Sequence, residues 1–153
     1  MMHLLNISMK KTIGRMKRIG VFLLFIVCFH STGSLKAHEI RPAFLQIVQV
    51  QQNSYEVYWK VPSLGDAVPK IQPVFPTGFT MENLKLPKQI QGSVIYYYRI
   101  TSDQALEGKE IYIEGLNKTL IDVLVTVEFL NGEKATLLLQ PNLDTIMIPY
   151  KTT

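Results

Sequence analysis

The position with the most suggestive chemistry in this sequence is His38, which follows Ala37 where the character of the chain changes. Cleavage between Ala37 and His38 would leave the free amine and the imidazole of one residue side by side. Such a donor pair chelates Cu(II) or Ni(II) in a tetragonal site of nitrogen and oxygen ligands. The residues that remain as further ligands are Glu39, Asp122, Met81 and Met147. We expect a frayed, solvated terminus and no cofactor; the alternative is that His38 is a metal ligand and that copper or nickel binds at the mature N-terminus.

Arg41 and Asp122 are the other polar residues that stand out. Arg41 precedes Pro42 at the start of an alternating segment, and Asp122 lies within the most hydrophobic segment of the chain. A charged group at the margin of a core needs a partner of opposite charge. The pattern predicts a structural ion pair between Arg41 and Asp122 that fixes the N-terminal segment to the sheet, with a ligand site as the alternative.

The rest of the sequence offers no catalytic constellation. After residue 37 the only histidine is His38, and no glycine-rich phosphate loop, Ser/His/Asp arrangement or paired metal-ligand motif is present. Acid–base chemistry is left to carboxylates, lysines and tyrosines, and no spacing singles out a pair of them. We predict a protein that is not an enzyme, with no catalytic residues and no small-molecule substrate.

Residues 1–37 have the three regions of a secretory signal peptide. Five basic residues between positions 10 and 18 precede an apolar run at positions 19–29, and a stretch of small and polar residues follows. The run is 11 residues long, shorter than the roughly 18 that a membrane-spanning helix needs. Cleavage after Ser34, lipidation of Cys28 and an uncleaved anchor are the alternatives. The sequence predicts export to the periplasm or the outer face of the cytoplasmic membrane.

Removing this leader changes the chemistry of the chain. Six of the 16 basic residues lie in positions 1–37, so ten remain against 12 acidic residues, a formal charge of −2. The remaining lysines are dispersed, which argues against a nucleic-acid partner. The only cysteine, Cys28, also leaves, so no disulfide forms. Residues 38–153 are long enough for one domain with a single core.

From Ile40 onward apolar residues recur with a period of two, as in half-buried strands. The segments 44–50 and 55–61 form a plausible hairpin around Asn53-Ser54, and Trp59 falls on the apolar face of the second. Segments 121–129 and 135–139 flank Asn131-Gly132, a dipeptide that favours positive φ at both turn positions. Further strands are expected at 70–75, 93–101, 110–114 and 145–148.

These elements predict an all-β fold, an antiparallel β-sandwich (Ig-like) of about seven to eight strands preceded by an N-terminal signal helix. An incomplete barrel is the alternative. Alternation within Tyr96-Tyr97-Tyr98 must send Tyr97 to the face opposite its neighbours. We expect tyrosines at a sandwich edge with their hydroxyls in water; a polysaccharide-binding platform of Tyr96, Tyr98 or Trp59 is the alternative.

Three segments in order resemble the extracytoplasmic N-terminal domain of HupE/UreJ-type membrane proteins. They are 37–45 (AHEIRPAFL), 55–62 (YEVYWKVP) and 113–125, which contains IEGL and TLIDVLV. The resemblance covers most of residues 37–149. In that family a bundle of transmembrane helices follows the domain, and some members are linked to nickel or cobalt uptake. This sequence ends at Thr153 without the helices that would carry metal.

The resemblance implies a non-enzymatic, exported accessory domain that works by interaction. Its expected partner is a multi-helix membrane transporter encoded nearby. The alternative is a soluble periplasmic copper- or nickel-binding β-sandwich protein, which predicts tight metal binding at His38.

Overall fold

Strands make up nearly all of the regular structure in the computed structural model, which describes residues 41–63, 65 and 67–152. The elements in order are β1 (Ala43–Gln51), β2 (Ser54–Pro62), β3 (Gln72–Val74), β4 (Thr80–Ile90), β5 (Ser93–Thr101), β6 (Glu110–Glu114), the 3₁₀-helix η1 (Leu116–Lys118), β7 (Val123–Glu128), β8 (Lys134–Leu139) and β9 (Thr145–Met147). The predicted all-β sandwich is confirmed. The predicted signal helix lies outside the described residues. Within them, no helix is long and apolar enough to cross a bilayer.

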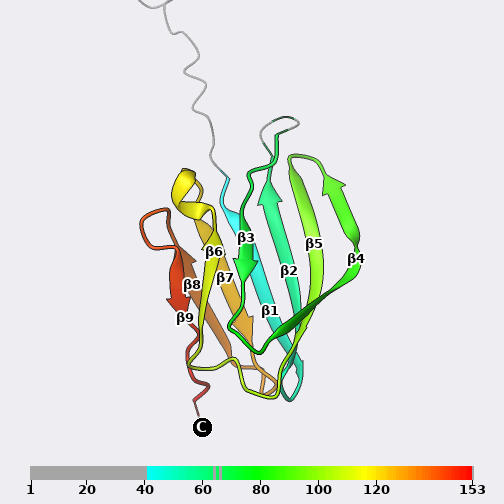
Figure 1. Ribbon diagram of the computed structural model, residues 1–153, viewed down its shortest axis with the longest axis vertical. Helices are drawn as coiled ribbons and strands as arrows, with labels where there is room; N and C mark the ends of the chain where they lie inside the picture. Colours follow the sequence, from blue (N-terminus) through cyan, green and yellow to red (C-terminus); the bar gives the residue numbers. More distant parts are fainter. Residues whose placement is uncertain (1–40, 64, 66, 153) are drawn as a thin grey trace, which may run out of the picture. The chain divides into compact units, whose positions relative to one another are not determined.

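Two sheets form the layers of the sandwich (Figure 1). The larger sheet has the strand order β4-β5-β2-β1-β7-β8, and the smaller has the order β3-β6-β9. All of these neighbours are antiparallel except β1 and β7, which run parallel with Ala43 opposite Val123. Alternation along a strand predicts its two faces but carries no information on its neighbour's direction, so this parallel pair was not predicted.

The core lies where the inner faces of the two sheets meet. Every second side chain of β1, β2 and β7 is buried, as the period of two requires. Trp59 is only 1% exposed, which confirms its predicted place on the core face. These side chains join Ile111 and Ile113 of β6 in one hydrophobic cluster. Burying a side chain of this size stabilises the fold by about 1.5–3 kcal/mol, so the alternation itself drives the two layers together.

Both predicted hairpins form, but with different turns. Among the described non-glycine residues only Asn53 has a positive φ, 59°, at the turn between β1 and β2. In the β7–β8 hairpin Gly132 has φ 82°, while Asn131 does not adopt positive φ. The expectation of positive φ at both positions was wrong, because the loop is longer than two residues. The Gly132 N–H donates to the Phe129 carbonyl at 2.9 Å, and the Asn131 side chain accepts the Glu133 N–H at 3.0 Å.

β4 is the longest strand and was not predicted. All of its residues are exposed except half-buried Leu84, so no alternation marks it in the sequence. Its pairing with β5 shifts register twice, between Asn83 and Lys85 and between Lys85 and Lys88. These irregularities accommodate Pro87, which lacks the N–H that a central strand needs. Pro87 therefore marks β4 as an edge strand of the larger sheet.

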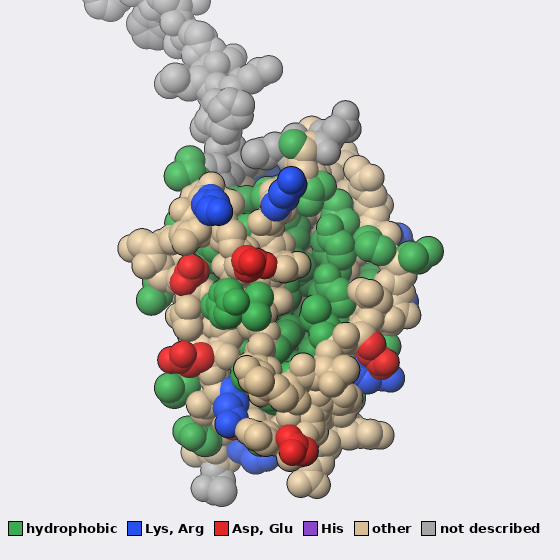
Figure 2. All heavy atoms as spheres, viewed as in Figure 1, with side chains coloured by type: hydrophobic (Ala, Val, Ile, Leu, Met, Phe, Trp, Pro, Cys, Tyr) green, Lys and Arg blue, Asp and Glu red, His purple; other side chains and the backbone are tan. Residues whose placement is uncertain are grey.

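The smaller sheet covers only part of the larger one. β3 is its edge strand, and β5 and β4 extend beyond it (Figure 1). In the same view a continuous strip of apolar side chains is visible over β2 and β5, between β3 and β4 (Figure 2). Tyr96 and Tyr98 of β5 pack against the core there and stay partly exposed. The sandwich is therefore open on the β4 side.

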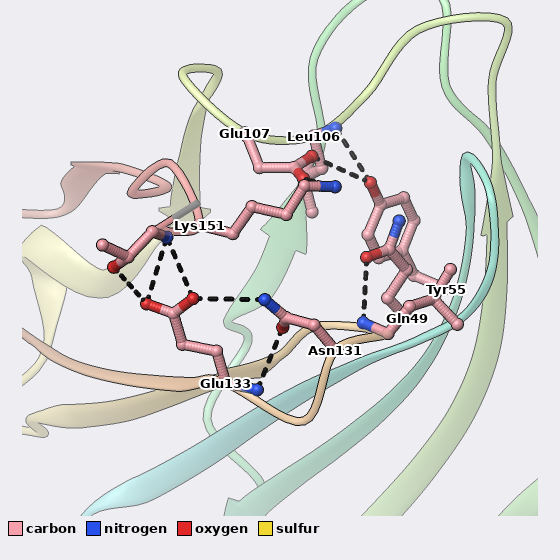
Figure 3. A network of polar contacts seen from close by, with 9 residues as sticks. Gln49, Tyr55, Leu106, Glu107, Asn131, Glu133 and Lys151 are labelled. Atoms are coloured by element: carbon pink, nitrogen blue, oxygen red, sulfur yellow. Dashed lines mark hydrogen bonds and ion pairs between the residues drawn. The ribbon is translucent and has the colours of Figure 1, made fainter.

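Polar contacts join the loops and the C-terminal segment at one end of the strands (Figure 3). Lys151 Nζ lies 3.3 Å from a carboxylate oxygen of Glu107, and Thr152 donates its N–H and its hydroxyl to Glu133. These hydrogen bonds lower the pKa of the Glu133 carboxyl. The Leu130 N–H donates to the side-chain oxygen of buried Gln49 at 3.2 Å. The segment after β9 is thus held to two loops of the domain.

Candidate interaction face

The structure describes some of the predicted site residues and not others. His38 and Glu39 lie outside the described residues, so the metal-ligand hypothesis for His38 stays a prediction. Met81 and Met147 are exposed on β4 and β9, strands that belong to different sheets. Among the described residues no three His, Cys, Asp or Glu side chains cluster as a metal site would require.

Arg41 and Asp122 lie just before the two strands that run parallel. The Ala43 N–H donates to the Asp122 carbonyl at 2.9 Å, which joins the start of β1 to the start of β7 through the backbone. The guanidinium of Arg41 reaches Gly92 at the β4–β5 turn, where a methyl group on Gly92 would lie 3.2 Å from Arg41 Nη1. The predicted side-chain ion pair stays a prediction. The Ala43–Asp122 backbone hydrogen bond attaches the start of β1 to the start of β7.

The most extensive candidate site is the outer face of the six-stranded sheet, the surface turned away from the smaller sheet. The strand registers arrange its side chains in three rows that cross all six strands from β8 to β4. The first row, apolar except for two lysines, is Leu138, Leu124, Phe44, Lys60, Ile95 and Lys88. The central row is Thr136, Thr126, Gln46, Tyr58, Tyr97 and Lys85. The charged row is Lys134, Glu128, Val48, Glu56, Arg99 and Glu82.

Aromatic rings occupy the middle of this face. Phe44 and Tyr58 meet edge to face with ring centroids 6.2 Å apart, and Tyr58 meets Tyr97 in the same way at 5.5 Å. Lys85 Nζ lies over the Tyr97 ring, 5.1 Å from its centroid. Burial, with a contribution from neighbouring Tyr97, raises the pKa of the Tyr58 hydroxyl. The rings of Phe44, Tyr58 and Tyr97 on β1, β2 and β5 therefore form a ladder of edge-to-face contacts.

Apolar side chains extend the ladder toward β7 and β8. Leu124 is 36% exposed and Leu138 is 49% exposed, and they lie directly opposite each other. Leu124 in turn lies opposite Phe44 across the parallel pair. Exposed leucines beside aromatic rings on a flat sheet are typical of a surface that another protein covers.

Ion pairs border this apolar area. Arg99 Nη2 lies 2.9 Å from Glu56 Oε1, and its Nη1 lies 3.7 Å from Glu82 Oε1. At the other end of the same row Lys134 Nζ lies 2.9 Å from Glu128 Oε2. Exposed pairs of this kind contribute little stability, about 0–1 kcal/mol each. A polar margin beside apolar and aromatic side chains is a common feature of protein–protein interfaces.

The sequence analysis predicted part of this face. Tyr97 does lie on the face opposite Tyr96 and Tyr98, as alternation required. Trp59 cannot belong to the candidate polysaccharide-binding platform of Tyr96, Tyr98 or Trp59, because its ring is buried in the core. Phe44 and Tyr58 were missed as neighbours of Tyr97. The available signal was their place on the polar face of two alternating segments, where aromatic residues have no core to fill.

No protein-family model matches this chain, and no curated protein matches it either.

Proposed function

We propose that this chain is an exported, non-enzymatic accessory domain that binds the extracytoplasmic part of a multi-helix membrane transporter through its outer face. The motivation for export is the leader of residues 1–37, and the motivation for the partner is the resemblance to HupE/UreJ-type N-terminal domains. A domain of this kind acts at the outer surface of the cytoplasmic membrane. It contributes contacts to an assembly and performs no chemical step.

The observation that carries the proposal is the ladder of Phe44, Tyr58 and Tyr97 with Leu124 beside it on a solvent-facing sheet. Aromatic side chains lose little conformational entropy on binding and are enriched in the energetically dominant part of interfaces. The outer face combines these rings with a row of charged groups, of which Arg99 is paired with Glu56 and Lys134 with Glu128.

Site-specific photo-crosslinking in cells tests the proposal. A benzophenone amino acid replaces Tyr97 on the outer face, and in a matched control it replaces Tyr112, an exposed tyrosine of β6 in the smaller sheet. We expect a crosslinked product in the membrane fraction for position 97, containing a multi-helix membrane protein, and none for position 112. Equal products at both positions, or none at position 97, would overturn the proposed surface.

A further inference from the structure

Acidic residues are absent from a long stretch of this chain. Residues 83–102 contain no Asp or Glu, although the whole sequence has 12 of them. The same stretch has three basic residues, Lys85, Lys88 and Arg99, and it forms most of the β4–β5 hairpin. Glu82, the only acidic residue of β4, lies before Lys85 and faces Arg99. The β4 edge is therefore locally basic, whereas the chain after residue 37 has a formal charge of −2.

Three lysines form the β4 end of the outer face. Lys60 of β2 and Lys88 of β4 lie on either side of Ile95 in the first row. Lys85 lies opposite Tyr97 in the central row. All three lysines are exposed, and none of them makes an ion pair with another described residue. Their ammonium groups are thus available to an anionic partner.

The burial of Ile95 fits lysine stems that lie over it. Ile95 is only 3% exposed, yet it does not belong to the core cluster between the two sheets. Its neighbours within the row are Lys60 and Lys88. The aliphatic part of a lysine covers an apolar neighbour while its ammonium group stays in water. Two positive charges are thereby kept at one part of the face.

Leu86 lies between the two lysines of β4. It falls where the register shifts between Lys85 and Lys88, and its exposed fraction is 88%, the largest of any large hydrophobic side chain among the described residues. Lysines and Pro87 on an edge strand prevent its pairing with other strands. An exposed leucine among them does not serve that purpose, because an apolar side chain in water favours association. Leu86 therefore needs an explanation of its own.

Two tyrosines lie beside Leu86. Tyr96 and Tyr98 line a hollow of about 490 Å³ to which Leu86 also contributes. Their rings are within 9° of parallel, with centroids 6.2 Å apart. Tyrosine is enriched where a bilayer meets water, because its ring is apolar and its hydroxyl is polar. The β4 edge thus combines basic, apolar and aromatic side chains.

We propose that the β4 edge binds the surface of a bilayer that contains anionic phospholipid. Leu86 enters the boundary between headgroups and acyl chains, and Lys85, Lys88 and Lys60 bind the lipid phosphates. A bilayer surface offers negative charge and hydrocarbon next to each other, the combination that this edge complements. A polyanion such as a nucleic acid would match the lysines but would offer no hydrocarbon layer to Leu86.

This contact does not rest on the proposed transporter, since lipid alone is the ligand. It occupies the β4 end of the outer face, whereas the transporter contact is assigned to the aromatic ladder and to Leu124 on the β7 side. A transporter embedded in the same bilayer leaves room for both contacts.

Flotation of the protein with lipid vesicles tests the proposal. The protein is purified from cells that express the full chain. One set of vesicles contains equal parts of phosphatidylglycerol and phosphatidylcholine, and the other contains phosphatidylcholine alone. Lys85→Gln/Lys88→Gln is compared with Lys70→Gln/Lys118→Gln, which removes the same charge from exposed lysines outside the hairpin. Both double variants have the same N-terminal segment, so any effect of residues 1–37 cancels.

We expect the natural protein and the Lys70→Gln/Lys118→Gln variant to bind the anionic vesicles and to lose most of this binding on phosphatidylcholine. Lys85→Gln/Lys88→Gln should weaken the binding about 25-fold, about fivefold for each lysine near the surface. Added salt should weaken it as well, because it screens the attraction between lysine and phosphate. Absence of binding, equal binding to both kinds of vesicle, or equal effects of the two double variants would overturn the proposal.

A second pair of variants tests the apolar part of the contact. Leu86→Ser should weaken binding to the anionic vesicles about tenfold. Leu120→Ser should leave it unchanged, although Leu120 is 78% exposed. Far-ultraviolet circular dichroism of each variant confirms that it is folded. If Leu86→Ser binds as tightly as the natural protein while the loss of Lys85 and Lys88 weakens binding, the lysines recognise a polyanion and the bilayer contact is excluded.

Discussion

The hydroxyl of Tyr55 joins β2 to the loop between β5 and β6: it accepts the Leu106 N–H at 3.0 Å and donates to Glu107 Oε2 at 3.3 Å. Glu107 in turn lies 3.3 Å from Lys151 Nζ (Figure 3). One core side chain therefore connects the interior of the large sheet to a loop 51 residues away and to the segment after β9.

Tyr55→Phe is expected to lower the free energy of unfolding by about 1–3 kcal/mol, because it leaves the buried Leu106 N–H without an acceptor. Urea denaturation followed by the fluorescence of Trp59, the only tryptophan, measures the change. Tyr112→Phe is the control, since Tyr112 is exposed, and its effect should stay within about 0.5 kcal/mol. Equal effects of the two changes would contradict the role of the Tyr55 hydroxyl.

Stability should decline in alkali. Burial raises the pKa of the Tyr55, Tyr58 and Tyr98 hydroxyls, so the folded state holds these protons more tightly than the unfolded state. Their contribution is complete below the unfolded pKa of about 10 and is lost as the pH rises through the folded values. Urea midpoints between about pH 8 and pH 11 should fall above about pH 10. Tyr98→Phe should make that fall shallower; an unchanged pH dependence would contradict the prediction.

Trp59 provides a test of packing against hydrogen bonding. Among the described residues its Nε1 is one of two buried polar side-chain atoms without a hydrogen-bond partner. Trp59→Ala should destabilise the fold by about 3–5 kcal/mol through the cavity that it leaves. Trp59→Phe should have less than half of that effect, because it keeps a ring and removes an unpaired donor. Thermal unfolding followed by circular dichroism compares the stabilities of the two variants. Similar losses of stability in both would mean that the indole N–H contributes to the fold.

Gly115 and Gly78 form a matched pair of turn glycines, with φ 79° and 93°. A methyl group at Gly115 would collide with the backbone carbonyl of Lys70, whereas nothing lies near that position at Gly78. Gly78→Ala should therefore be less stable by about 1–2 kcal/mol, the strain of a left-handed alanine. Gly115→Ala should lose about 1–3 kcal/mol more from the clash. Denaturant midpoints of the two variants decide this, and equal values would exclude the close approach.

The hypothesis of a soluble copper- or nickel-binding protein makes a prediction about His38. Protein cleaved between Ala37 and His38 should bind one Cu(II) or Ni(II) through the terminal amine and imidazole. One extra residue before His38 should abolish this binding, because it separates the amine from the ring. Isothermal titration of both forms measures the difference. Unchanged affinity after the extension would remove His38 from any metal site.

The sequence determined the fold class of this protein. Apolar residues that alternate along β1, β2 and β7 give each strand one apolar face, and that face must be buried. It located Trp59 in the core and placed Tyr97 on the face opposite Tyr96 and Tyr98. These are properties of a single strand, and a period of two is enough to predict them.

Only the tertiary structure decided which strands are neighbours. The parallel pairing of β1 with β7 places Phe44 beside Leu124, and the β1–β2 and β2–β5 registers bring Phe44, Tyr58 and Tyr97 into one ladder. Contacts between strands depend on direction and register, which local patterns do not carry. β4 escaped prediction for a related reason. An edge strand that is exposed along nearly all of its length has no apolar period, so β4 emerged only from the folded chain.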